Sequence, residues 1–135
     1  MKATELMIGD WIYDNYHKAY GRVNTLTRAL LWVGEEDDDW QLNYDEIEPI
    51  PITAEILERN GFEEEHGYNE VVYMDYGDDN YSICIHLKER NYTNGAYTFA
   101  NIDSGYICIE ELPINYVHEL QHTLRLCSID KEIEL

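Results

Sequence analysis

The chain contains one short stretch whose residue types and spacing are those of a zinc peptidase. Residues 118 to 122 read His-Glu-Leu-Gln-His, which on a helix places two imidazoles four residues apart on the same side. In zinc peptidases both rings bind one metal, and the carboxylate beside the first ring activates the bound water. On this hypothesis His118 and His122 bind zinc, and Glu119 is the general base of a small hydrolase.

The surroundings of this motif do not complete a catalytic zinc site. Such a site requires three protein ligands and an open position inside a cleft. The segment after the motif offers no ligand of the metzincin type, whereas His66 and His86 stay open as ligands from upstream. On a helical wheel both motif histidines fall opposite the apolar stripe, together with Arg125, so we expect them to face solvent. The main expectation is therefore no catalytic residue and no cofactor, with zinc as the alternative.

The helix that carries the motif is expected from Pro113 to about Cys127, because proline is favoured in a first helical turn. Its apolar stripe consists of Tyr116, Val117, Leu120, Leu124 and Cys127. A stripe of this kind must be buried, and the simplest partner is a sheet. We expect the helix to cover one face of that sheet.

The sheet is predicted from strand-like segments in the second half of the chain. Alternating apolar residues separated by polar turns favour an antiparallel meander, with a loop at Asn94-Gly95. The isoleucines of Ile83-Cys84-Ile85 share one face while the cysteine lies on the other, so both faces are partly apolar. The four predicted strands are residues 71–76, 81–87, 96–102 and 106–110.

The first 48 residues are also strand-like. Segments 9–13, 21–26 and 30–33 are rich in β-branched and aromatic residues, which predicts a small bent sheet or half-barrel. The acidic run that follows is expected to form a hairpin tip, since it lacks the spaced oxygen ligands and the glycine of a calcium loop. It is also the candidate interaction surface, and its residues are Glu35, Glu36, Asp37, Asp38 and Asp39.

Two prolines mark the joint of the chain, because Pro49 and Pro51 hold the backbone extended. A short helix over 54–60 follows, with Thr53 as N-cap and Gly61 at the left-handed C-terminal position. The predicted class is α+β: a small N-terminal bent β-sheet or half-barrel, a short helix, and a four-stranded antiparallel sheet covered by a C-terminal helix. Residues 1–135 form a single domain, in which subunits 1–48 and 53–135 are joined at Pro49–Pro51.

Composition restricts the partners of the chain. Its 135 residues suffice for a core, and 28 acidic against 9 basic residues give a formal net charge of −19. Such charge repels nucleic-acid phosphates and anionic membranes, so direct binding to either is not expected. Cys84, Cys108 and Cys127 are predicted to be reduced thiols, and the chain carries no recognisable signal or membrane-spanning segment. These features favour a cytoplasmic protein.

Four segments together resemble a family of small uncharacterised bacterial and prophage-associated proteins. They are residues 5–11 (Glu-Leu-Met-Ile-Gly-Asp-Trp), 49–53 (Pro-Ile-Pro-Ile-Thr), 56–62 (Ile-Leu-Glu-Arg-Asn-Gly-Phe) and 116–121 (Tyr-Val-His-Glu-Leu-Gln). In many members of that family Gln stands at the place of Glu119 and Asn at the place of His122. Because Gln cannot activate water, the resemblance implies that the peptidase-like spelling is incidental. It carries no activity over to this chain.

The sequence therefore leads to one main hypothesis and two alternatives. The main hypothesis is a non-catalytic acidic module that binds a basic protein, as an accessory of a mobile element, with tyrosine-rich strands as interface anchors. The first alternative is the zinc-dependent hydrolase. The second is a nucleic-acid mimic that blocks a DNA-binding enzyme, for which carboxylates would need phosphate-like spacing.

Overall fold

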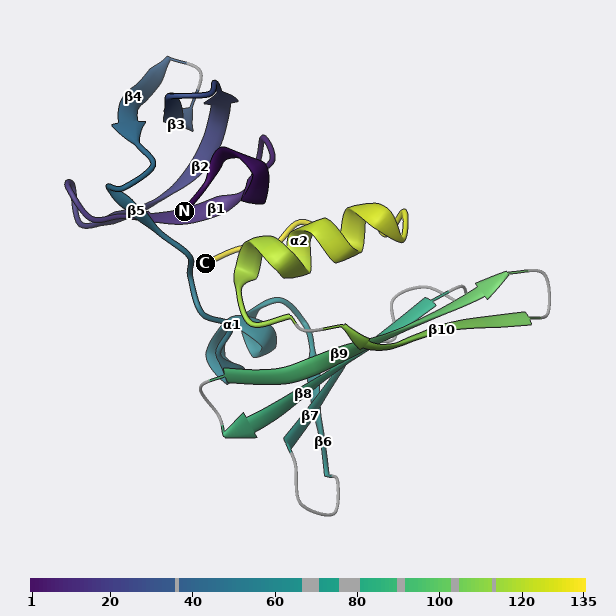
Figure 1. Cartoon of the computed structure of the whole chain (residues 1–135). Helices are drawn as coiled ribbons and strands as arrows, with labels where there is room; N and C mark the ends of the chain where they lie inside the picture. The colour runs from purple at the N-terminus through teal and green to yellow at the C-terminus, as the bar shows by residue number, and fades with distance from the viewer. Residues whose placement is uncertain (36, 67–70, 76–80, 90–91, 103–104, 113) are drawn as a thin grey trace. The chain divides into compact units, whose positions relative to one another are not determined.

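The computed structural model describes residues 1–35, 37–66, 71–75, 81–89, 92–102, 105–112 and 114–135. Within 65–113 the described side chains are those of Ile83 and Ile85. The chain divides into two compact units: Met1–Ile50 with Tyr116–His122 form unit 1, and Pro51–Asn115 with Thr123–Leu135 form unit 2. Among the described residues, each unit contains one five-stranded antiparallel sheet, and two α-helices are present (Figure 1). The predicted α+β class is confirmed.

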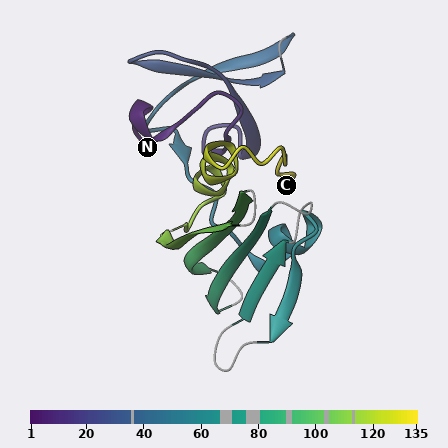
Figure 2. The same ribbon diagram turned by 90° about the vertical axis from the view of Figure 1, so that its right-hand side faces the viewer.

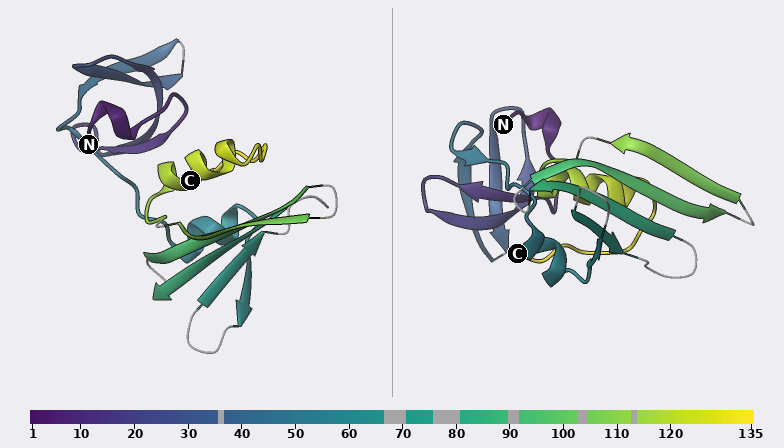
Figure 3. Two further views of the ribbon diagram at one scale, coloured as in Figure 1. Left: turned by 45° about the vertical axis from the view of Figure 1, so that its right-hand side comes forward. Right: turned by 90° about the horizontal axis from the view of Figure 1, so that it is seen from below.

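The sheet of unit 1 is a meander whose last strand returns to the first. A 3-10 helix, η1 (Ala3–Glu5), precedes β1 (Trp11–Asp14), β2 (Ala19–Leu26), β3 (Leu30–Glu35), β4 (Asp38–Asn43) and β5 (Ile47–Glu48). The strand order is β4-β3-β2-β1-β5, so β4 and β5 lie at opposite edges although residues 44–46 are all that connect them. So short a connection requires a strongly curled sheet, which Figure 3 shows. The bent N-terminal sheet is thus confirmed.

The curl encloses the core of unit 1. In β1 the residues alternate between partly exposed and buried, so that Ile12 and Asp14 point inward while Trp11 and Tyr13 point outward. The inward apolar residues of the other strands meet Ile12. This core consists of Leu6, Ile12, Val23, Leu31, Val33, Leu42 and Ile47.

The sheet of unit 2 has one strand more than predicted. It is built from β6 (Glu63–His66), β7 (Val71–Asp75), β8 (Tyr81–Glu89), β9 (Tyr92–Ile102) and β10 (Gly105–Leu112), in the order β10-β9-β8-β7-β6 (Figure 2). The additional strand is β6, whose Glu-rich sequence lacks the apolar alternation of a strand. It is the edge of the sheet, where charged side chains are tolerated because one side of the strand stays unpaired.

The predicted loop at Asn94-Gly95 is wrong. Both residues lie inside β9, where Gly95 pairs with His86 of β8. Register shifts on either side of Leu87 accommodate the longer strand. An Asn-Gly pair favours a turn, but strand pairing can override this local preference. Here the pairing of β9 with β8 continues through both residues.

The short helix α1 (Ala54–Arg59) confirms the prediction for residues 54–60. The Thr53 hydroxyl accepts a hydrogen bond of 3.3 Å from the backbone N–H of Ile56, and Gly61 has φ of +79°. Asn60 then fixes the end of the chain, because its side chain donates to the carbonyl of Glu134 at 2.7 Å and accepts from the N–H of Glu134 at 2.8 Å.

The second helix, α2 (Val117–Leu126), begins later than the predicted start at Pro113, a residue that lies outside the described part of the chain. Tyr116–His122 belong to unit 1 and Thr123–Leu126 to unit 2. Cys127, just beyond α2, is a half-buried thiol, while the side chains of Cys84 and Cys108 are outside the described ones. Of the described helices, neither has the length and apolar character required to cross a bilayer.

Candidate functional site

Glu119, the general base in the hydrolase hypothesis, forms a hydrogen bond that caps the first turn of α2. Its Oε2 accepts a hydrogen bond of 3.1 Å from the backbone N–H of Tyr116, the residue that precedes the helix. The first N–H groups of a helix have no partner within it, so a carboxylate at this place stabilises the helix start. Glu119 therefore has a structural role in this conformation.

Gln121 joins α2 to the chain segment that leads into β1. Its side-chain oxygen accepts from the N–H of Trp11 at 2.9 Å, and its side-chain nitrogen donates to the carbonyl of Gly9 at 3.0 Å. The Gln121 side chain is buried, and the two backbone groups that it bonds to belong to partly buried residues. One amide thus satisfies two backbone groups on either side of Asp10, as a neighbouring strand would.

His122 adds a third bond to the same segment. Its Nε2 lies 2.6 Å from Oδ2 of Asp10, a carboxylate that is fully buried and also accepts from the N–H of Met7 at 2.7 Å. Because an ionised carboxylate only accepts hydrogen bonds, Nε2 carries the hydrogen. We call the contacts of Gln121 and His122 with Gly9, Asp10 and Trp11 the helix clamp.

The prediction that both histidines face solvent is wrong. His118 is 5% exposed, and the side chain of His122 is 20% exposed. The apolar stripe is nevertheless buried as predicted at Val117, Leu120 and Leu124. The first half of α2 is thus covered on its polar side as well, by backbone and carboxylate groups more than 100 residues earlier in the chain. A helical wheel cannot predict these partners, because it describes only the helix and not the segments that pack against it.

The clamp also bears on the metal hypothesis. The rings of His118 and His122 lie edge to face with their centroids 5.7 Å apart. Nε2 of His122 donates to Asp10, so a metal at this nitrogen would have to displace that hydrogen bond. In the described part of the chain, no group of three or more His, Cys, Asp or Glu side chains is placed to hold a metal ion. The side chains of His66 and His86 lie outside the described ones.

His118 is a buried neutral group. Burial lowers the pKa of its imidazole, and the nearby carboxylates of Glu119 and Asp10 oppose this effect without overcoming it. Its Nδ1 has no hydrogen-bond partner among the described residues, and its ring stacks on Tyr116 at 5.9 Å. An open cavity of about 250 Å³ adjoins it, lined by Thr4, Glu5, Leu6, Met7, His118, Glu119 and His122.

The acidic residues predicted as an interaction surface are brought together on the β3–β4 hairpin. Glu35 ends β3 and pairs with Asp38, while Asp39 pairs with Gly34, so the strands extend further into the run than predicted. Asp39 accepts a hydrogen bond of 3.2 Å from the side chain of Asn24. Glu36 lies outside the described residues. The exposed members, which we call the acidic hairpin, are Glu35, Asp37, Asp38 and Asp39.

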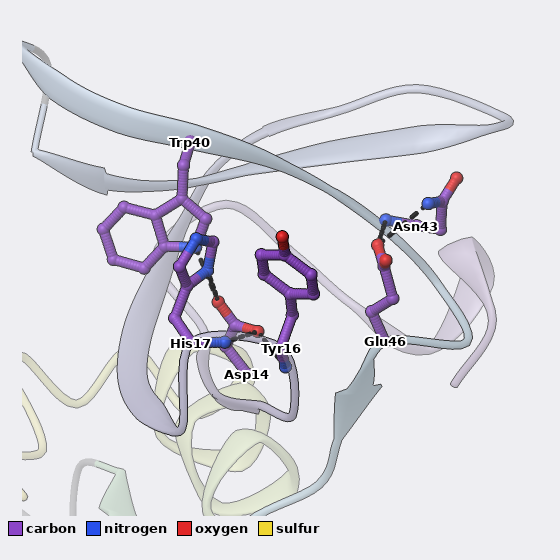
Figure 4. Close-up of polar contacts among 6 residues, drawn as sticks. All are labelled: Asp14, Tyr16, His17, Trp40, Asn43 and Glu46. Atoms are coloured by element: carbon purple, nitrogen blue, oxygen red, sulfur yellow. Dashed lines mark hydrogen bonds and ion pairs between the residues drawn. The ribbon is translucent and has the colours of Figure 1, made fainter.

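A second buried carboxylate, Asp14, organises a group of aromatic rings that the sequence reasoning did not single out (Figure 4). Its Oδ1 accepts from the N–H groups of Tyr16 at 2.7 Å and His17 at 3.0 Å. Its Oδ2 accepts from the indole of Trp40 at 2.7 Å and lies 2.5 Å from Nδ1 of His17. Burial raises the pKa of Asp14, but the hydrogen bonds from His17, Trp40 and Tyr16 outweigh burial and lower it.

These donors hold three rings in a row, the aromatic row of Tyr16, His17 and Trp40. The His17 ring meets Tyr16 at 4.8 Å and Trp40 at 5.4 Å, in both cases edge to face. Tyr16 is 73% exposed and the His17 side chain 45% exposed. The sequence does contain a signal for the turn, because an Asp followed at two and three residues by backbone donors is typical of an Asx-turn. It contains none for the partnership with Trp40.

Two glycines make room for Trp40. A Cβ at Gly21 would lie 3.4 Å from Cζ2 of the indole and 2.2 Å from Cγ1 of Val33. A Cβ at Gly34, whose φ is +125°, would lie 3.1 Å from Cζ3 of the indole. The ring is therefore fixed by close backbone contact as well as by its hydrogen bond.

Comparison of the chain with protein-family models, with curated proteins and with solved structures found no match.

We predict that Gln121→Ala destabilises unit 1 by about 1–3 kcal/mol, because it removes the hydrogen bonds to two partly buried backbone groups. Urea unfolding followed by tryptophan fluorescence measures this, since Trp11, Trp32 and Trp40 all lie in unit 1. The control is Leu126→Ala in the same helix, at a side chain 81% exposed, where a change of about 0.5 kcal/mol or less is expected. Equal effects of the two substitutions would contradict the clamp.

A second prediction concerns pH. Because the folded-state pKa of His118 is below its ordinary value of 6.5, the unfolded chain binds the proton first as the pH falls. The contribution of His118 to stability is therefore complete above pH 6.5 and is lost as the pH falls toward the folded-state pKa. Urea unfolding of the wild type and of His118→Leu between about pH 5 and 8 should show a difference that grows toward acid. Parallel profiles would show that burial does not disfavour the charged ring.

Proposed function

We propose that the protein is a non-catalytic binding module whose acidic hairpin takes a basic partner protein. The observation that carries this proposal is the gathering of Glu35, Asp37, Asp38 and Asp39, all exposed, on one hairpin. The formal net charge of −19 adds a long-range field of the same sign. Complementary charge increases the rate of encounter with a basic surface and disfavours phosphate-rich partners.

The helix clamp supports a non-catalytic role. Glu119, Gln121 and His122 each make a hydrogen bond that maintains the helix start or its attachment to β1. A catalytic group needs a substrate-accessible position in which its reactive atom is not already used. Two of the three residues that define the peptidase motif, Glu119 and His122, thus have structural roles that explain their presence without a reaction.

The resemblance to prophage-associated proteins extends the proposal to a biological setting. In an accessory protein of a mobile element, a basic partner would be a protein that handles nucleic acid, since such proteins carry basic surfaces. A mimic of nucleic acid would bind the same partner but would occupy its nucleic-acid site. Competition by DNA for the captured partner separates these two functions.

Charge reversal tests the acidic hairpin. We expect Glu35→Lys/Asp37→Lys to reduce capture of the partner from a native lysate by about tenfold at low salt, and raised salt to release the wild-type complex. Asp45→Lys/Glu48→Lys is the matched control, because it changes the net charge equally at exposed positions of the same unit. The proposal fails if no partner is enriched at any salt concentration, or if both double variants lose it equally.

Metal analysis tests the alternative hydrolase. Protein purified without an affinity tag should contain far less than one zinc per chain, and His122→Ala should leave that content unchanged. A content of about one zinc per chain, lost in His122→Ala while circular dichroism stays the same, would instead favour a catalytic metal at the motif.

A further inference from the structure

We propose that the aromatic row is a subsite for an arginine side chain of the basic partner. The inference rests on the proposed function, which makes the partner basic. It adds the place on this protein where an arginine of that partner binds and the interaction that binds it. The row consists of Tyr16, His17 and Trp40, and it lies in unit 1 together with the acidic hairpin.

The rings are held in place before any ligand arrives. The buried carboxylate of Asp14 bonds to the indole N–H of Trp40 and to Nδ1 of His17, and its other oxygen fixes the backbone at Tyr16 and His17. Gly21 and Gly34 hold the indole from the backbone side. A ligand that stacks on these rings therefore loses less free energy to their ordering than it would on mobile side chains.

Two of the rings are also accessible. Tyr16 is 73% exposed and the side chain of His17 is 45% exposed, while Trp40 is partly buried against the core of unit 1. Figure 4 shows the Tyr16 and Trp40 rings on either side of His17, above the carboxylate of Asp14. A fixed aromatic surface that is partly exposed is typical of an interface anchor.

The local charge favours a cation over a neutral ligand. Trp40 directly follows Asp38 and Asp39 in β4, and its indole lies beside the backbone of Gly34, the residue that pairs with Asp39 of the acidic hairpin. The π-faces of Trp and Tyr attract cations, and nearby carboxylates strengthen that preference. Lys18, which follows His17 in the turn, is exposed and its like charge opposes this attraction, so the cation preference depends on the carboxylates of the acidic hairpin.

Unit 1 already contains the same chemistry within its own fold. On the outer face of β1 and β2, the guanidinium carbon of Arg22 lies 4.8 Å from the centroid of Trp11. Arginine is favoured over lysine at such a surface, because its planar guanidinium stacks on rings and is more weakly hydrated. The subsite should therefore distinguish arginine from lysine and both from an uncharged isostere.

NMR of the ¹⁵N-labelled full chain tests the subsite. The probe is a synthetic peptide of alternating arginine and glycine, with matched peptides that carry lysine or citrulline in place of arginine. The indole N–H signal of Trp40, assigned by Trp40→Phe, should move with the arginine peptide, less with lysine and not with citrulline. The indole signals of Trp11 and Trp32 serve as internal references and should stay in place.

Two tyrosine variants distinguish binding at the aromatic row from nonspecific binding to any exposed tyrosine. Tyr16→Ser should weaken binding of the arginine peptide about two- to fivefold, the amount expected for one exposed cation–π contact. Tyr20→Ser should leave it unchanged, because Tyr20 is 57% exposed on the same hairpin but pairs with Tyr13 on the opposite face from Asp14. Dispersed amide spectra establish that both variants are folded.

The outcomes distinguish this inference from the proposed function. Equal binding of the citrulline peptide, equal effects of the two tyrosine variants, or a silent Trp40 signal would each overturn the arginine subsite. If the partner is then still captured in a salt-sensitive way by the acidic hairpin, the proposed function stands without the subsite. If the arginine peptide moves the Trp40 signal but charge reversal leaves partner capture unchanged, the proposed function fails and the cation site stands.

Discussion

The attachment of α2 to the start of β1 is the interaction on which unit 1 depends. The first half of a helix near the end of the chain is held to Gly9, Asp10 and Trp11 by one amide and one imidazole. Buried polar groups cost free energy unless each is paired, so this contact is stable only in one register. It closes a loop of more than 100 residues, within which all of unit 2's sheet is inserted.

Two carboxylates at the ends of one strand are buried, in contrast to the exposed carboxylates of the acidic hairpin. Asp10 precedes β1 and Asp14 ends it, and both are fully buried. Each gathers donors from distant parts of unit 1: Asp10 binds the helix through His122, and Asp14 binds β4 through Trp40. A chain with a net charge of −19 thus uses two of its acids to organise the fold and exposes others on the acidic hairpin.

Two segments that are far apart in the chain are joined by one side chain. Residues 5–11 and 116–121 are in contact, because Gln121 bonds to the backbone at Gly9 and Trp11. This contact gives both segments a structural role. In the same way Asn60, within residues 56–62, bonds to the backbone of Glu134.

The sequence predicted a structural element correctly where the residues that determine it lie within a few positions of each other. Thr53 and Gly61 predicted the limits of α1, and apolar alternation predicted most strands, because caps and pleats depend on neighbours in sequence. The sequence also determined the acidity and the apolar stripe of α2. Only the tertiary structure decided that His118 and His122 are buried and that Asp14 holds Trp40, because those partners come from other strands whose positions no local pattern encodes.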